Sequence, residues 1–233
     1  MSAPEEVSPW LRRMVEFVAA ETTPTTLPHV PEITLRLARE SVPLWTRIEN
    51  DPGLPHCPPY WAFAWAGGLA LARHVIDHPA LVAGRRVLDF ASGSGLIAIA
   101  AAKCGAAHVL AADIDPLAIV ALSLNAEANG VAVAATAEDF LADGVFDPAG
   151  VDVVLVGDAF YDPTFAPRAL AFLARCRATG CEVLIGDPGR ADLPVALLEK
   201  LSAQAVPVTR GCQHVAAVAD YEPHAAAVWR WVA

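Results

Sequence analysis

Hydrophobic and polar positions follow two periods along this chain, and from residue 86 onward the two periods alternate. A run such as 151–156 (VDVVLV) is typical of a buried strand, whereas 96–102 (LIAIAAA) is typical of a helix. Strands that alternate with helices indicate an α/β fold with a doubly wound, mostly parallel seven-stranded sheet. The predicted strands are 86–89, 108–112, 131–135, 151–157, 182–186, 206–209 and 226–232, and the predicted helices are 96–104, 116–129, 165–179 and 193–203.

Residues 1–58 have a different pattern and are expected to form a small helical and strand extension that packs on a core domain of residues 59–233. Ser8 is a candidate N-cap for an amphipathic helix from residue 9 to about residue 20. Residues 22–26 are expected to be a connecting loop, and residues 33–37 alternate as in a half-buried strand. A second core helix is expected at 69–78, after a Gly-Gly pair.

The turn after the first core strand carries the strongest chemical signal. Residues 85–96 read RRVLDFASGSGL, which predicts a strand, a small-residue loop and the start of a helix. Gly93 and Gly95 can adopt backbone conformations that a side chain would forbid, so the loop can approach a ligand closely. The first turn of the helix adds unpaired N–H groups. A nucleoside cofactor is therefore the expected occupant.

Two cofactors compete for this turn. The spacing Gly93-x-Gly95-x-x-Ala98 matches the dinucleotide fingerprint, with Asp113 at the distance of a ribose-binding acid. Asp89, the last residue of the strand, argues against a dinucleotide, because a carboxylate there would repel the pyrophosphate. S-adenosylmethionine has no phosphate, and a carboxylate attracts its sulfonium and ammonium groups. The sequence therefore favours S-adenosylmethionine.

Acidic residues follow the predicted strands in succession. Ligands of such sheets bind beyond the carboxyl ends of the strands, so these acids are expected to meet at one site. Helix N-termini also favour Asp as a cap, and that explanation fits Asp115 best. The acids are Asp89, Asp113, Asp115, Glu138, Asp139, Asp158 and Asp187.

The acids after the second and third strands are candidates for nucleoside recognition. Asp113 is placed to accept both ribose hydroxyls. Asp139 could accept a hydrogen bond from the adenine amino group, with Phe140 or Ile114 lining the base. A helix cap would explain Asp139 as well, so both interpretations stay open.

The segment Asp158-Ala159-Phe160-Tyr161-Asp162 follows the fourth strand, where an acceptor would meet a transferred methyl group. Asp158 is expected to attract and orient an ammonium, while the rings of Tyr161, Phe160 and Trp61 offer cation–π contacts. An attacking amine must lose its proton, and proximity and the exclusion of water would supply much of the rate. Alternatively, Phe160 and Tyr161 only cover the end of the sheet.

Four aromatic residues lie within six positions of segment 58–68, immediately before the Gly-Gly pair. Core packing alone would account for one or two of them. Together they predict one wall of a pocket. They are Tyr60, Trp61, Phe63 and Trp65.

The composition of the chain limits which kinds of molecule it is expected to bind. A net charge of −10, with 16 Lys and Arg against 26 acids, argues against nucleic acid and suits a lysine-bearing protein. Five scattered cysteines without a C-x-x-C pair, and His74 and His78 without a zincin pattern, give no reason to expect a metal site. No apolar run approaches the roughly 20 residues of a membrane span. The acidic start is unlike a signal peptide, so the expected compartment is the cytoplasm.

With these motifs the chain resembles the Rossmann-like class I S-adenosylmethionine-dependent methyltransferases, and it is most similar to the electron-transfer-flavoprotein β-subunit lysine methyltransferases. It carries their D-x-F-Y-[DE] motif at 158–162, their P-Y-W-A-F-x-W-x-G-G approach at 59–68 and their G-D-P-G-R strand end at 186–190. The resemblance covers most of the chain from about residue 31. Ala91 replaces the usual first glycine of the cofactor loop.

The resemblance implies methyl transfer from S-adenosylmethionine to lysine side chains of a folded protein. The expected protein is the electron transfer flavoprotein β-subunit, with a ribosomal protein as a second candidate. Asp158 and Tyr161 would face the acceptor lysine, Trp65 would lie beside the methionine part of the cofactor, and Arg190 has either a functional or a structural role. The expected cofactor contacts are Trp65, Asp89, Ala91, Gly93, Gly95, Asp113, Ile114, Asp139 and Phe140.

Three alternatives stay open. One is a methyltransferase for another acceptor: a ribosomal protein of the L11-methyltransferase type, a nucleic acid or a small-molecule amine. Another is an NAD-dependent oxidoreductase, against which Asp89 and the lack of a separate substrate domain argue. The third is a cofactor-binding module without chemistry.

Overall fold

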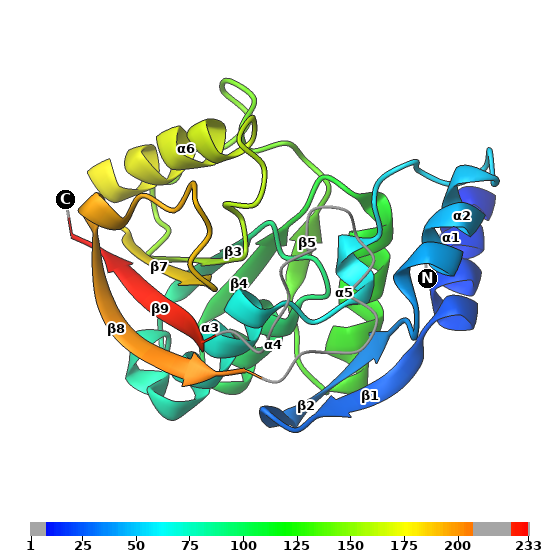
Figure 1. The fold of residues 1–233 in the computed structure, drawn as a ribbon, viewed down its shortest axis with the longest axis horizontal. Coiled ribbons are helices and arrows are strands. Elements are labelled where there is room, and N and C mark those ends of the chain that lie inside the picture. The colour runs from blue at the N-terminus through cyan, green and yellow to red at the C-terminus, as the bar shows by residue number, and fades with distance from the viewer. Residues whose placement is uncertain (1–7, 207–224, 233) are drawn as a thin grey trace, which may run out of the picture.

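A computed structural model describes residues 8–206 and 225–232, and its centre is a seven-stranded sheet in the order β5-β4-β3-β6-β7-β9-β8 (Figure 1). The first five strands in this order run parallel, while β9 is antiparallel to both of its neighbours. The predicted α/β, mostly parallel seven-stranded sheet is confirmed. The strands are β3 (Arg86–Phe90), β4 (His108–Ala112), β5 (Ala134–Thr136), β6 (Val153–Gly157), β7 (Glu182–Asp187), β8 (Leu198–Ala205) and β9 (Ala225–Trp231).

Helices cover both faces of this sheet, which makes the fold doubly wound. Helices α3 (Ala66–Asp77), α4 (Leu96–Lys103) and α5 (Pro116–Ala128) contribute to one hydrophobic cluster, and α6 (Ala166–Ala178) contributes to the cluster on the opposite face. Side chains of β6 alternate between the two, since Val153 and Leu155 belong to the first cluster and Val154 and Val156 to the second. Burial on both faces explains why the strands are apolar throughout.

The N-terminal residues form helix α1 (Pro9–Glu21), a β1–β2 hairpin (Thr23–Leu27 and Val30–Leu37) and helix α2 (Ser41–Glu49). The predicted N-cap is confirmed, because Ser8 Oγ accepts a hydrogen bond from the N–H of Leu11 at 3.1 Å. Apolar residues of the hairpin share the hydrophobic cluster of α3 and α4, so the extension packs on the domain. Short 3₁₀ helices lie at Tyr60–Ala62, Pro79–Leu81 and Val195–Leu197.

Two elements of the sequence prediction are wrong. Residues 22–26 were expected to be a loop, but β1 occupies most of this stretch, because its β-branched threonines pair with β2. Residues 193–203 were expected to be helical, but β8 begins at Leu198 and pairs along the whole of β9. The pairing that β9 offers outweighs the helix propensity of these residues. Of the strand expected at 206–209, Val206 lies outside β8, and 207–209 lie outside the described residues.

Glycines let the first turn of α3 lie directly on the end of the sheet. A Cβ atom on Gly67 would come within 2.2 Å of the carbonyl oxygen of Gly186 in β7, and one on Gly157 in β6 would meet Cα of Gly68 in α3 at 3.0 Å. Only glycine fits at these contacts. The N-terminus of α3 is thereby brought to the carboxyl ends of β6 and β7. Within residues 8–206 and 225–232, none of the helices has the length and apolar character needed to cross a bilayer.

Candidate functional site

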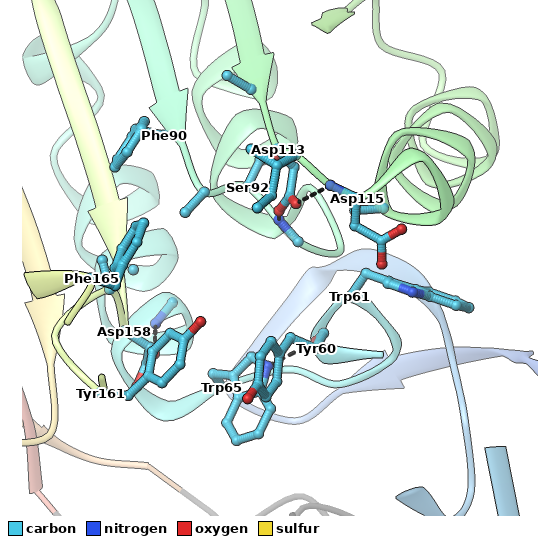
Figure 2. A pocket seen from close by; sticks show the side chains of 18 of the residues that line it. Tyr60, Trp61, Trp65, Phe90, Ser92, Asp113, Asp115, Asp158, Tyr161 and Phe165 are labelled. Atoms are coloured by element: carbon cyan, nitrogen blue, oxygen red, sulfur yellow. Dashed lines mark hydrogen bonds between the residues drawn. The ribbon is translucent and has the colours of Figure 1, made fainter. Parts of the chain in front are cut away.

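A cavity of about 400 Å³ opens beyond the carboxyl ends of β3, β4 and β6 (Figure 2). Its walls are the turn at residues 90–94, segment 57–65 and the stretches that follow β4, β5 and β6. The expectation that the acids at the strand ends meet at one edge holds for the five that line it: Asp113, Asp115, Glu138, Asp139 and Asp158. In the described part of the chain, no three metal-ligating side chains group so that they could hold a metal ion.

The turn after β3 has a left-handed backbone at three positions. The φ angles are 57° at Ala91, 50° at Gly93 and 79° at Gly95. A Cβ atom on Gly95 would lie 2.7 Å from Leu122 Cγ of α5, so this glycine also permits close packing. The left-handed conformation of Ala91 is strained because its Cβ atom is crowded there, whereas a glycine would adopt it without strain. We call residues 91–95 the glycine loop.

Asp89 lies beneath the glycine loop and does not line the cavity. Its side chain is fully buried, and Oδ2 accepts a hydrogen bond from the N–H of Ala98 in the first turn of α4 at 2.9 Å. Burial raises the pKa of Asp89 to about 8, so the carboxyl is mostly neutral at pH 7. The predicted contact of Asp89 with the cofactor stays a prediction. Six other carboxyl side chains line the cavity itself.

Asp113 holds the glycine loop from the end of β4. Its Oδ2 accepts from the N–H of Gly93 at 2.8 Å and its Oδ1 from the N–H of Asp115 at 3.0 Å. Asp115 caps α5 as the sequence suggested, because its Oδ1 accepts from the N–H of Leu117 at 2.9 Å. Burial raises the pKa of both carboxyls, that of Asp115 to about 7.

The three residues expected near an adenine base all line the cavity. Asp139 accepts from the N–H of Leu141 at 2.9 Å and pairs with Arg168 at 3.3 Å, but the structure has a turn and no helix at this point, so the helix-cap interpretation is wrong. Phe140 is almost fully buried and stacks on Phe146, with ring centroids 4.1 Å apart. Ile114 is 63% exposed, which leaves its side chain free to cover a flat ligand.

Asp158 links β6 to the N-terminus of α3. Its Oδ2 accepts from the N–H of Gly68 at 2.8 Å, and its Oδ1 lies 3.3 Å from Nη2 of Arg190. Its φ of 54° is rare for a residue with a side chain and is found where a site stores strain. Burial raises the pKa of Asp158 to about 6, although the Arg190 charge opposes this. The carboxyl is therefore mostly ionised at neutral pH.

Three aromatic side chains stand next to Asp158, and we call Tyr60, Trp65 and Tyr161 the aromatic wall. The ring centroid of Tyr60 lies 5.2 Å from that of Tyr161 and 5.8 Å from that of Trp65. The indole N–H of Trp65 donates to the carbonyl oxygen of Tyr60 at 2.8 Å, which fixes the wall (Figure 2). Tyr60 was noted only as part of the aromatic segment, and its contact with Tyr161 spans 101 residues of sequence.

The two side chains expected to contact the substrate, Phe160 and Trp61, are both almost fully buried. The Phe160 side chain is 1% exposed and packs in the cluster that contains α6, so it covers the end of the sheet. The Trp61 side chain is also 1% exposed, and its ring packs among residues of α1, α2 and α5. Figure 2 shows its indole beside Asp115 and pointing away from Asp158. Phe160 is absent from the cavity lining and packs in the core, whereas Trp61 is part of the lining, so the substrate contact of Trp61 stays a prediction.

Arg190 has a structural anchor and also lines the cavity. Asp187 Oδ1 accepts from the N–H groups of Gly189 and Arg190, both at 2.7 Å, which closes the turn after β7. This turn presents the guanidinium to Asp158 and places it 6.0 Å from the ring centroid of Tyr161. The structural role is thus confirmed, and a functional role of Arg190 stays a prediction that its place in the cavity lining permits.

In the comparisons with known proteins, a family profile and two relatives that match this chain are all named methyltransferases. Residues 74–157 match the profile of the ribosomal protein L11 methyltransferase (PrmA) family. The chain is 45% identical over 162 residues to the electron transfer flavoprotein β-subunit lysine methyltransferase of Danio rerio, covering 69% of this chain and 61% of the relative. It is 42% identical over 179 residues to the protein of that name from Xenopus laevis, covering 75% of this chain and 70% of the relative.

The fold also occurs in solved structures. Magnesium protoporphyrin IX methyltransferase from Synechocystis PCC 6803, solved with bound S-adenosylmethionine, superposes with a TM-score of 0.50 at 15% sequence identity. The match covers 80% of this chain and 88% of that protein. At this identity the comparison shows a shared fold. The chain spans about 61% of the length of the zebrafish relative.

Proposed function

This chain belongs to the electron transfer flavoprotein β-subunit lysine methyltransferase family, and from that premise we propose that it transfers methyl groups from S-adenosylmethionine to lysine side chains of the electron transfer flavoprotein β-subunit. The observation that carries the proposal is the identity of 42% to a relative of this name over 70% of that relative's length. The cavity supports it, because a cationic donor and a cationic acceptor suit an acidic site.

The residues of the cavity fit S-adenosylmethionine. Six carboxyl side chains and two guanidinium groups line it, and this balance favours a sulfonium and disfavours a pyrophosphate. Asp113 and the glycine loop would hold the ribose, Ile114 and Phe140 would line the base, and Trp65 would lie beside the methionine part. When bound, S-adenosylmethionine supplies an electrophilic methyl group on its sulfonium.

Asp158 and the aromatic wall would receive the acceptor lysine. The ionised Asp158 carboxylate attracts an ammonium, and the ring faces of Tyr60 and Tyr161 favour a cation beside them. Tyr161 is 37% exposed, so the acceptor end opens to solvent, where the ammonium can lose its proton. The fixed carboxylate and rings then hold the amine in line for attack and keep water away from it.

The competing acceptors have less support. A ribosomal protein L11 methyltransferase of Bordetella parapertussis is 36% identical over 141 residues, which cover 39% of that relative, whereas the flavoprotein relatives match 162 and 179 residues and 61% and 70% of their own lengths. The acidic lining and the net charge of −10 oppose binding of nucleic acid.

The cytoplasmic location is part of the proposal and rests on the sequence alone.

A methylation assay tests the proposal. The purified chain is incubated with methyl-labelled S-adenosylmethionine and the electron transfer flavoprotein β-subunit of the same organism, with ribosomal protein L11 as the parallel substrate. We expect the flavoprotein subunit to gain whole methyl groups by intact mass, located on lysine by fragmentation. Labelling of L11 alone would overturn the choice of acceptor.

A further inference from the structure

Asn125 of α5 connects two segments that are far apart in sequence. Its side chain is fully buried. Its Oδ1 accepts a hydrogen bond from the N–H of Arg36 in β2 at 2.7 Å, and its Nδ2 donates to the carbonyl oxygen of Ser94 in the glycine loop at 2.8 Å. Both polar atoms of the amide are therefore used on the backbone of other segments. The residue is a direct link between the N-terminal hairpin and the wall of the cavity.

The glycine loop needs such a support. Ser94 lies between Gly93 and Gly95, both left-handed, in a loop that is free to adopt other conformations once it is detached. Asp113 holds one side of the loop through the N–H of Gly93. Asn125 holds the other side through the carbonyl oxygen of Ser94. The loop conformation that faces the cavity is thus fixed from β4 and from α5.

Asn129, one helical turn later, has only half of this arrangement. Its Oδ1 accepts from the N–H of Thr34 in β2 at 3.1 Å, and its Nδ2 donates to the carbonyl oxygen of Thr34 at 2.6 Å. A third bond joins its Nδ2 to the carbonyl oxygen of Asn125 at 2.8 Å. Asn129 therefore grips the hairpin but makes no hydrogen bond to the glycine loop. A substitution at Asn129 therefore serves as a control, because it removes hydrogen bonds to the hairpin and leaves the bond to the glycine loop in place.

We propose that Asn125 is a positioning residue for the methyl donor: while the β1–β2 hairpin holds its Oδ1, its Nδ2 fixes the glycine loop through the carbonyl oxygen of Ser94. The identity of the ligand rests on the proposed function. The positioning of the loop does not, since it is a property of the protein without ligand.

The variant Asn125→Asp separates the two contacts. It keeps an oxygen for the N–H of Arg36, loses the donor to Ser94 and sets a carboxylate oxygen against the carbonyl oxygen of Ser94. We expect the Kd for S-adenosylmethionine, measured by calorimetry, to rise about tenfold or more, the effect of one buried polar group left without its partner. The control Asn129→Ala should stay within about twofold of the wild-type Kd, because it leaves the loop bond intact. In methyl transfer, the KM for the donor should rise in Asn125→Asp while the KM for the protein acceptor stays unchanged.

Amide hydrogen exchange of the ligand-free protein gives a second readout. We expect the segment 91–95 to exchange faster in Asn125→Asp than in Asn129→Ala. If Asn125→Asp does not fold, Asn125→Ala is compared with Asn129→Ala in the same way. Equal Kd values and equal loop exchange in the two positions would contradict the proposal. If the wild type binds no S-adenosylmethionine, the proposed function fails, and the exchange comparison alone still decides whether Asn125 positions the loop.

Discussion

Replacing Asp158 with Asn is expected to lower methyl transfer by at least about a hundredfold, the range found when an electrostatic group at a reacting centre is removed. The amide has the same shape and can still accept the hydrogen bond from Gly68, so the end of α3 stays in place. It has no charge, and therefore cannot attract an ammonium. Initial rates with the flavoprotein subunit measure the loss.

Binding of S-adenosylmethionine to Asp158→Asn should stay within about threefold of the wild type, because the nucleoside end of the cavity is untouched. The wild-type rate should also fall as the pH drops through about 6, since the carboxyl becomes protonated there and loses its charge. Asp162→Asn is the matched control and should keep most of the wild-type rate: this neighbouring acid closes the turn before α6 by accepting from the N–H groups of Thr164 and Phe165, and an Asn side chain can accept the same bonds. A rate that survives in Asp158→Asn would refute the acceptor role.

Replacing Asp113 with Ala is expected to weaken S-adenosylmethionine binding by about a hundredfold, measured by calorimetry. Two effects add. The variant frees the N–H groups of Gly93 and Asp115, so the glycine loop loses one of its two anchors. It also removes the carboxylate expected to bind the ribose hydroxyls, and bonds to a charged acceptor contribute about 1.5–3 kcal/mol.

The acid Asp139 provides the comparison for Asp113→Ala. Its side chain is about half-exposed and already bonded to the N–H of Leu141 and to Arg168, so Asp139→Ala should weaken binding by less than about fivefold. Equal losses in the two variants would indicate a general effect of removing cavity charge, and an unchanged affinity in Asp113→Ala would show that the ribose end is misplaced.

The hydrophobic pattern along the chain predicted the parallel strands, because a strand that is buried on both faces, such as β6, is apolar at nearly every position. It failed at β8, whose residues favour a helix and become a strand only because β9 lies beside them. That partner is separated from β8 by 19 residues, beyond the reach of a pattern within one segment. The prediction of a loop at the β1 threonines was wrong for the same reason, since these residues form a strand by pairing with β2.

The strand-end rule placed Asp113, Asp139 and Asp158 at one cavity, since it depends only on topology. The direction of a side chain depends on local backbone and packing, which the sequence pattern did not reveal. Asp89 points beneath the loop toward Ala98, and Phe160 packs under α6, although each is adjacent to a residue that lines the cavity. Counting aromatics in segment 58–68 predicted a wall but could not tell that Tyr60 faces Tyr161 while Trp61 faces the core.

The account depends on a sulfonium donor, and not a dinucleotide, occupying the cavity beside the glycine loop. The most direct measurement is a calorimetric titration of the wild-type protein with S-adenosylmethionine and, separately, with NAD⁺, followed by displacement of one by the other. We predict saturable binding of S-adenosylmethionine that NAD⁺ does not displace. Saturable binding of NAD⁺ that excludes S-adenosylmethionine would contradict the account.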